Sequence, residues 1–259
     1  MELESMLAKA MEYINPLGFS LWMFIGVAIA KAVSAEMLNL MILQGLHLVS
    51  FPKMPSREPV PISKGLEYLE RKDYVFLVLN QAVELVFLLN LAVFALTLPR
   101  EAEELTVLNT VVVFYAAFLL DDFFYYFMHR FLHVPAVYPY VHKHHHRQPL
   151  PYRGYVDAAN ESPLEQVGGL ACIFGTIKIL TPLLGFHVFT LATFFSVFAV
   201  LAYLNHTPYD IKLGIWGLEY TVRAHETHHR MLRGNYSQNT MLWDKLFGTY
   251  LEYPSRKFD

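Results

Sequence analysis

The sequence predicts an all-α, polytopic helical membrane protein with about four to five membrane-embedded helices and a histidine-rich helical cap on the cytosolic side. Three observations support this fold class. The chain has 259 residues, of which 54% are hydrophobic and only 17% are charged, whereas soluble domains carry about 25% charged residues. Several apolar stretches are long enough to cross a bilayer. Nine of the twelve histidines fall in two short windows, 127–147 and 223–230.

Charge and cysteine content exclude other classes of protein. The 20 Lys and Arg residues against 23 Asp and Glu residues give a formal net charge of -3, which leaves no positive surplus to bind phosphate backbones. We therefore expect the lipid bilayer, and no nucleic acid, as a partner. The single cysteine, Cys172, lies in an apolar run, which excludes a disulfide framework and a cysteine-based zinc site.

Residues 1–104 predict N-terminal membrane helices and a cytosolic loop. Apolar residues flank Lys31 on both sides, which fits either one tilted span or two short membrane-embedded segments. The clearest span is 74–98, because its 25 residues make about 37 Å of helix against a hydrocarbon core of about 30 Å. The polar residues Asn80, Gln81 and Glu84 interrupt it. Such residues serve either helix packing or substrate contact.

Two further apolar stretches follow the short acidic turn 99–104. The first begins at Leu105 and predicts another span. The second, residues 167–204, is interrupted by Pro182 and Gly185. Its 38 residues would make about 57 Å of helix, so a helical hairpin with both ends on the same side fits better than one span. The sequence contains no repeat or separate soluble region, which favours one integrated membrane domain.

The distribution of Lys and Arg predicts the orientation. Loop 52–73 and the region from residue 210 onward are rich in Lys and Arg, whereas turn 99–104 carries three glutamates. Because Lys and Arg are enriched in cytosolic segments, we place the basic regions in the cytosol and the acidic turn on the opposite side. All clustered histidines then face the cytosol.

The first two histidine clusters follow helical spacing. HRFLH places His129 and His133 at positions i and i+4, on one face of a helix. Alone, such a pair is more often an interfacial feature than a metal site. VHKHHH contains His142, His145 and His146 at spacing HxxHH, which also shares a helical face.

The third cluster, AHETHH, repeats the HxxHH spacing with His225, His228 and His229. His144 is displaced by about 200° from the start of its own cluster and is excluded. Neutral imidazole binds iron, zinc, copper and nickel, and eight imidazoles exceed what one ion can hold, so two metal ions are predicted. His206, at the end of the predicted hairpin, is a ninth candidate, with an interfacial histidine as an equal alternative.

HRFLH, HKHHH and HETHH, in this order and after DDFFYYF, resemble the three histidine boxes of the membrane fatty acid hydroxylase and sterol desaturase superfamily. Residues 235–250 are similar to the segment that follows the family's last box. SPLEQ, residues 162–166, is also similar to a family segment, although the family often has histidine in place of Ser162. The resemblance covers about 105–250, and it identifies residues 105–259 as a fatty acid hydroxylase-like diiron domain.

The resemblance implies a non-haem centre of two iron ions with histidine ligands, which activates O2 at the cytosolic membrane face. The family's ligands map onto His129, His133, His142, His145, His146, His206, His225, His228 and His229. Some members carry a further histidine where this chain has Ala202, so water held by Asn205 is expected to complete the second iron. The family implies electrons from a separate cytochrome b5 and its NADH reductase, because this sequence has no haem-binding segment, dinucleotide fingerprint or CxxC pair.

Metal-bound imidazoles usually donate their other N–H to a carboxylate or carbonyl. Asp122 lies two turns before His129, nearly on the same face, and is predicted to orient that ring. The alternative is an interfacial carboxylate in water. Asp244 and Glu226 are weaker candidates for the same task.

The favoured function is hydroxylation of an unactivated C–H bond of a fatty acyl, sphingoid or sterol lipid. Acid–base and nucleophilic side chains cannot cleave such a bond, so a metal-bound oxidant is required. A lipid desaturase and a sterol C-4 methyl oxidase of the same superfamily are the alternatives. The terminal RKFD, residues 256–259, faintly resembles a retrieval signal of the endoplasmic reticulum, which is the expected location.

Two other classes explain less of the sequence. HETHH also fits the HExxH motif of a zinc membrane protease, with His225 and His229 as ligands and Glu226 as general base. That function leaves the first two clusters unexplained. A histidine-rich metal transporter is disfavoured, because transport sites lie near the middle of the bilayer and these clusters lie at helix ends.

Overall fold

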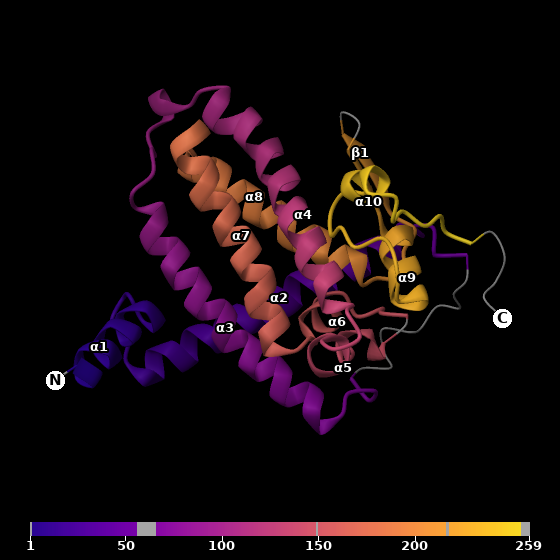
Figure 1. Cartoon of the computed structure of the whole chain (residues 1–259), viewed down its shortest axis with the longest axis horizontal. Helices are drawn as coiled ribbons and strands as arrows, with labels where there is room; N and C mark the ends of the chain where they lie inside the picture. The colour runs from indigo at the N-terminus through magenta and orange to yellow at the C-terminus, as the bar shows by residue number, and fades with distance from the viewer. Residues whose placement is uncertain (1, 56–65, 149, 216–217, 255–259) are drawn as a thin grey trace.

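The computed structural model describes residues 2–55, 66–148, 150–215 and 218–254, so the terminal RKFD lies outside the described residues. A bundle of long helices carries short elements gathered at one end (Figure 1). The long helices are α2 (Leu21–Leu48), α3 (Arg71–Ala95), α4 (Val113–Leu132), α7 (Pro163–Leu184) and α8 (Val188–Asn205). A π-helical turn, Leu108–Val112, precedes α4. Five segments of the described chain are thus long and apolar enough to cross a membrane, which confirms the predicted fold class.

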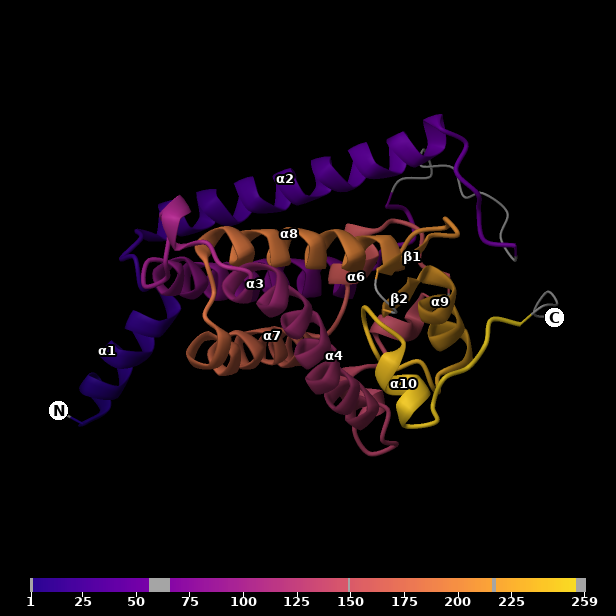
Figure 2. The same cartoon turned by 90° about the horizontal axis from the view of Figure 1, so that it is seen from above.

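The first apolar region forms one helix rather than two short segments. α2 follows Ser20, whose hydroxyl accepts a hydrogen bond from the N–H of Met23 at 3.3 Å. Lys31 does not interrupt α2, because its ammonium group forms an ion pair with Glu84 of α3. Figure 2 shows α2 along one side of the bundle, with α1 (Glu2–Ile14) before it. An ion pair between helices allows a lysine to lie within an otherwise apolar span.

The predicted hairpin is confirmed as α7 and α8. α7 begins after Ser162, whose hydroxyl accepts a hydrogen bond from the N–H of Glu165 at 3.3 Å. The helix continues through Pro182 and ends at Gly185, whose φ of 74° lies in the region that favours glycine. Of the two interruptions in the sequence, Gly185 therefore makes the turn.

The two larger of three clusters of buried apolar side chains join the long helices to the rest of the described chain. The main core, between α3, α4, α7 and α8, contains Leu91, Leu98, Val113, Ala117, Phe118, Ile173, Ile177, Leu180, Phe186, Leu191 and Phe194. The second cluster joins the ends of α2 and α8 to the chain beyond α8 and contains Leu43, Met54, Leu204, Tyr209, Ile211, Tyr220 and Val222. This second cluster fixes the short terminal elements against the long helices.

These short elements form a cap at the end of the bundle that lies away from the N terminus (Figures 1 and 2). They are α5 (Tyr138–Val141), a 3₁₀ turn (His145–Arg147), α6 (Tyr155–Ala159), β1 (Lys212–Ile215), β2 (Leu218–Thr221), α9 (Val222–Met231) and α10 (Leu242–Leu246). At the other end, a 3₁₀ turn (Ala102–Glu104) lies in the acidic connection. β1 and β2 pair antiparallel, an addition to the predicted all-α architecture. The cytosolic location of the cap stays a prediction.

Candidate metal centre

The structure gathers the nine predicted histidine ligands where the cap meets the bundle. They come from the end of α4, the segment 142–146, the end of α8, and α9. They form two groups, in each of which one ring nitrogen per residue lies within 4.8 Å of the others. The first group is His129, His133, His142, His146 and His228, and the second group is His145, His206, His225 and His229. All of these side chains are buried except that of His133, which is half-buried.

The second and third histidine clusters each contribute to both groups. α9 is a regular helix, so His225 and His229 share a face, with their Nε2 atoms 3.0 Å apart, while His228 belongs to the first group. The second cluster is not one helix, because α5 ends at Val141 and a 3₁₀ turn begins at His145. The predicted common face is therefore wrong for His145, which lies in the second group.

Hydrogen bonds at Nδ1 determine which ring nitrogen carries the proton. Backbone carbonyls accept a hydrogen bond from Nδ1 of four rings, and a carbonyl oxygen cannot donate one. The pairs are His129 with Tyr236 (2.8 Å), His228 with Gly234 (2.7 Å), His206 with Ala202 (2.9 Å) and His229 with Gln148 (3.2 Å). The Glu165 carboxylate accepts from Nδ1 of His142 at 2.6 Å. In these five rings the Nε2 atom therefore presents a lone pair.

The Nε2 atoms face one another at short distances. Those of His129 and His142 are 2.9 Å apart, and those of His206 and His225 are 3.1 Å apart. His129 and His142 both carry their proton on Nδ1, so they cannot share a hydrogen bond through Nε2, and their lone pairs repel unless a cation lies between them. Two nitrogen ligands at right angles, each about 2.1 Å from an ion, are about 3.0 Å apart. The donor atoms of both groups therefore fit a bound metal cation.

Burial keeps these imidazoles uncharged at neutral pH. Burial, with a smaller contribution from the His228 ring, lowers the pKa of His133 to about 3, and burial lowers the pKa of His228 to about 4. Burial first, and neighbouring rings second, hold the pKa of His145, His225 and His229 well below the usual range. Neutral imidazole is the form that binds metal ions, so neither group has to release protons first.

Asp122 does not orient His129, which corrects the prediction from the sequence. Its carboxylate accepts hydrogen bonds from three consecutive backbone N–H groups of the loop 238–240, at 3.1, 2.9 and 2.6 Å. The Nδ1 atom of His129 is instead occupied by the carbonyl of Tyr236. Asp122 therefore positions the His129 ring only indirectly, by holding the loop that follows Tyr236.

Asp244 supports the same loop from its other end. Its two carboxylate oxygens accept hydrogen bonds from the N–H groups of Tyr236 and Ser237, both at 2.8 Å. Because the carbonyl of Tyr236 holds His129, Asp244 positions that ring indirectly. Glu226, the other weak candidate, pairs with Arg230 at 2.8 Å.

Glu165 is the carboxylate that the sequence reasoning missed as a partner of the histidines. It is buried on α7, and its Oε1 atom contacts His142. Glu161 and Glu165, together with His145, also place one possible ligand atom each within 4.8 Å of one another. Burial raises the pKa of Glu161 to about 8. Glu165 lies 23 residues from His142, so helical spacing could not pair the two. The similarity of SPLEQ to a family segment was the one sequence signal at this position.

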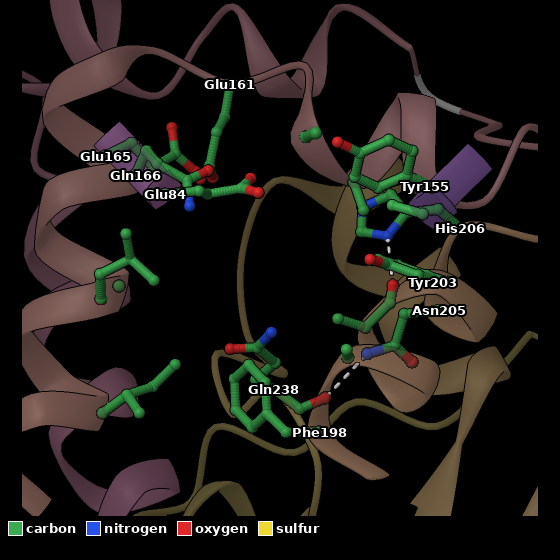
Figure 3. A pocket seen from close by; sticks show the side chains of 18 of the residues that line it. Glu84, Tyr155, Glu161, Glu165, Gln166, Phe198, Tyr203, Asn205, His206 and Gln238 are labelled. Atoms are coloured by element: carbon green, nitrogen blue, oxygen red, sulfur yellow. Dashed lines mark hydrogen bonds between the residues drawn. The ribbon is translucent and has the colours of Figure 1, made fainter. Parts of the chain in front are cut away.

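The remaining predicted residues lie at the edges of the centre. Asn205 is buried beside the second group and donates a hydrogen bond from Nδ2 to the carbonyl of Gln238 at 2.8 Å (Figure 3). Its role in holding water stays a prediction. His144 lies outside both groups, as expected, and its Nε2 atom is 2.9 Å from Asn160 and 3.0 Å from Asp73.

A cavity of about 270 Å³ lies between the second histidine group and the long helices (Figure 3). His145, His206 and His225 line one side. Apolar side chains of α3, α7 and α8 line much of the rest, among them Leu88, Leu170, Ile173, Phe195 and Phe198. A hydrocarbon segment can therefore approach the second histidine group without entering water.

Comparison with known proteins assigns the part of the chain that contains the centre. Residues 114–249, more than half of the chain and all nine histidines, match the family described as fatty acid hydroxylase. The chain is similar to methylsterol monooxygenase 1 of Rattus norvegicus, with 33% identity over 141 residues that cover 52% of this chain and 45% of that protein.

Two other relatives carry different activities in their names. The chain is 32% identical over 147 residues to the Delta(7)-sterol 5(6)-desaturase of Eremothecium gossypii, covering 54% of this chain and 38% of that protein. It is 31% identical over 161 residues to a very-long-chain aldehyde decarbonylase of Oryza sativa subsp. indica, and the match covers 59% of this chain and 56% of that protein. The match spans less than two thirds of the length of each of these three relatives. No solved structure matches the chain.

Proposed function

Because the chain belongs to the fatty acid hydroxylase family, we propose that it is a membrane-bound non-haem diiron oxygenase that hydroxylates an unactivated C–H bond of a lipid. The substrate is a fatty acyl, sphingoid or sterol lipid, and O2 and external electrons are consumed. One observation carries this proposal. Two groups of buried imidazoles present unprotonated nitrogens to one another beside an apolar cavity.

The two groups would hold one iron ion each. The first ion would be bound by His129, His133, His142, His146 and His228, and the second by His145, His206, His225 and His229, with water beside Asn205. Bound iron supplies the O2-dependent oxidation that side chains alone cannot perform. Zinc would fit the imidazoles but has no redox chemistry.

The protein itself contributes orientation and exclusion of water. Carbonyl groups and Glu165 hold five of the nine rings through Nδ1, so the Nε2 atoms of these five keep a fixed direction. The apolar wall of the cavity guides a lipid toward His206 and His225. Electrons would come from a separate cytochrome b5 and its NADH reductase. We place the protein in the endoplasmic reticulum with the cap in the cytosol.

Oxidation of a sterol methyl group or desaturation is the second candidate function. It is favoured by the similarity to a methylsterol monooxygenase and a sterol desaturase. The zinc protease loses support, because Glu226, its general base, forms an ion pair with Arg230 and accepts a hydrogen bond from Tyr253 at 3.1 Å.

Lipid and sterol profiling of cells with and without the protein tests the proposed function. We expect a hydroxylated lipid to appear with the protein, and purified membranes to form it only with O2 and added reductant. A product formed without oxygen would contradict the proposal. A desaturated or demethylated product would select the second candidate.

A further inference from the structure

One side of the cavity carries polar groups that C–H oxidation does not require. We call Lys31, Glu84, Tyr155 and Glu161 the polar wall; all four line the cavity. They come from α2, α3, α6 and the residues just before α7. Figure 3 shows Glu84, Tyr155 and Glu161 around the open centre of the cavity. Polar groups at the depth of apolar helices usually mark a functional contact.

The polar wall offers no free positive charge. Lys31 is the one Lys or Arg residue among the described residues that line the cavity, and its Nζ atom is paired with Oε2 of Glu84. Both side chains are about four-fifths buried, with 18% and 20% of their surface exposed. A carboxylate or phosphate head would have to lie in this cavity without a cationic partner, which is costly. The wall therefore disfavours anionic lipids.

Tyr155 supplies a hydrogen-bonding group without a partner. Its side chain is 6% exposed, and its hydroxyl makes no hydrogen bond within 3.5 Å in the described part of the chain; Gln81, whose Oε1 atom also lacks a partner, is its polar neighbour. Figure 3 shows this hydroxyl pointing into the cavity. Buried hydroxyl groups are nearly always hydrogen-bonded, and a polar group on a bound ligand can supply the partner that this one lacks within 3.5 Å.

Tyr155 also lies next to the second histidine group. The backbone N–H of Gly154 donates to the carbonyl of His206 at 2.9 Å, and Tyr155 and His206 line the same cavity. A ligand head held by Tyr155 thus has its nearest carbons beside the second group. Carbons far along a chain would lie deeper, among the apolar side chains of α7 and α8.

We propose that the polar wall binds the uncharged hydroxyl head of a lipid alcohol and places a carbon close to that head against the second histidine group. The Tyr155 hydroxyl donates a hydrogen bond to the head oxygen, and a carboxyl oxygen of Glu84 or Glu161 accepts a hydrogen bond from the head hydroxyl. This proposal rests on the proposed function for its reaction, but the binding step requires neither iron nor O2.

Binding to the metal-free protein in lipid nanodiscs tests the proposal. The probes are 1-octadecanol and cholesterol, each compared with its methyl ether, and octadecanoic acid and octadecylamine as charged heads. We expect at least one alcohol to bind about tenfold more tightly than its ether, the acid or the amine. Equal binding of all heads, or tighter binding of the acid or the amine, would overturn the proposal. The skeleton that shows the preference distinguishes a sterol from a chain alcohol.

Two variants assign the preference to the wall. Tyr155→Phe removes a hydroxyl without a partner, so the fold should be unaffected, and alcohol binding should weaken about three- to tenfold with ether binding unchanged. Glu84→Gln leaves Lys31 without its carboxylate partner, so the affinity for octadecanoic acid should increase at least tenfold. Tyr209→Phe is the matched control, because its hydroxyl donates to the carbonyl of Leu43 outside this cavity.

Alcohol preference unchanged in both wall variants would refute the assignment, provided that thermal unfolding shows both variants to be folded. The outcome is separable from that of the proposed function. A protein that lacks iron yet prefers alcohols would refute the oxygenase alone. An iron-dependent oxygenase that binds all heads equally would refute the polar wall alone.

Discussion

Five histidines of the centre are oriented by a partner at the second ring nitrogen, Nδ1. The clusters could be predicted from the sequence, because histidines three or four residues apart are visible in one short window. Their partners could not, because Tyr236 lies 107 residues from His129 and the partner atom is a backbone carbonyl. Asp122 was predicted from helical spacing alone, and the structure gives it the backbone of the loop 238–240 instead.

Glu165 is expected to matter as much as a direct ligand. Glu165→Leu removes the acceptor at Nδ1 of His142, and loss of such a partner typically lowers metal affinity or activity 10- to 100-fold. Glu165→Gln keeps a carbonyl oxygen and should lose less. Metal titration of the purified variants measures the affinity. Wild-type affinity in Glu165→Leu would show that the 2.6 Å contact has no orienting role.

The buried imidazoles should make the metal-free protein less stable as the pH falls. The pKa of His228 is about 4 in the folded chain and 6.5 ordinarily, so protons bind the unfolded chain first. The contribution of such a neutral ring to the free energy of unfolding is therefore complete above pH 6.5. It is lost between about pH 6.5 and pH 4, at up to about 1.4 kcal/mol per pH unit for each ring.

Thermal unfolding of the metal-free protein at pH 7.5 and 5.5 measures this loss. Buried carboxyl groups such as Glu161 act in the opposite direction, so the comparison includes a variant with His133→Gln and His228→Gln. We expect the midpoint temperature to fall more in the wild type than in this variant. An equal or larger fall in the variant would contradict the low pKa values.

At the scale of elements, apolar length and turn residues predicted most of the bundle. The hairpin of α7 and α8 could be predicted because its apolar stretch is too long for one span and is interrupted by Pro182 and Gly185, of which Gly185 has the positive φ. The single α2 helix was not, because the partner that tolerates Lys31 is Glu84 on another helix. The β1–β2 hairpin was missed because its strands have only four residues each.

Gly185→Ala tests the turn between α7 and α8. A Cβ atom at Gly185 would meet Asn109 at an ordinary 3.6 Å, so the cost comes from the backbone, whose φ of 74° favours glycine. We expect a loss of about 1–3 kcal/mol in the free energy of unfolding. Gly175→Ala, within α7 and facing open space, is the control and should be neutral or stabilising. Equal effects of the two substitutions would contradict this origin of the turn.

At the scale of the whole molecule, the sequence predicted a membrane bundle with a histidine-rich cap, and the arrangement in space fits it. The predicted division of the chain between residues 104 and 105 stays a prediction. Helices α3 and α7, which lie on either side of it in the sequence, pack against each other. The sequence also contains glycosylation sequons at Asn160 and Asn235, which a cytosolic cap would leave unglycosylated. Both side chains are buried and hydrogen-bonded in the folded chain, so a glycan on either would disrupt the cap.

Cysteine labelling tests the orientation directly. In a Cys172→Ser background, Tyr140→Cys places a thiol on the cap at a residue that is 85% exposed. Glu103→Cys places one in the exposed acidic turn at the other end. In sealed microsomes, a membrane-impermeant maleimide should label Tyr140→Cys at once and Glu103→Cys only after detergent is added. The reverse pattern would place the histidines in the lumen.

The iron content of the purified protein tests the central claim most directly. We predict two iron ions per chain by mass spectrometry, one in each histidine group. His145→Ala and His228→Ala should each lose at least one ion and all product formation, whereas His47→Ala, an exposed residue outside both groups, should keep both ions. A single ion per chain, a content of zinc in place of iron, or full turnover in either ligand variant would contradict the account.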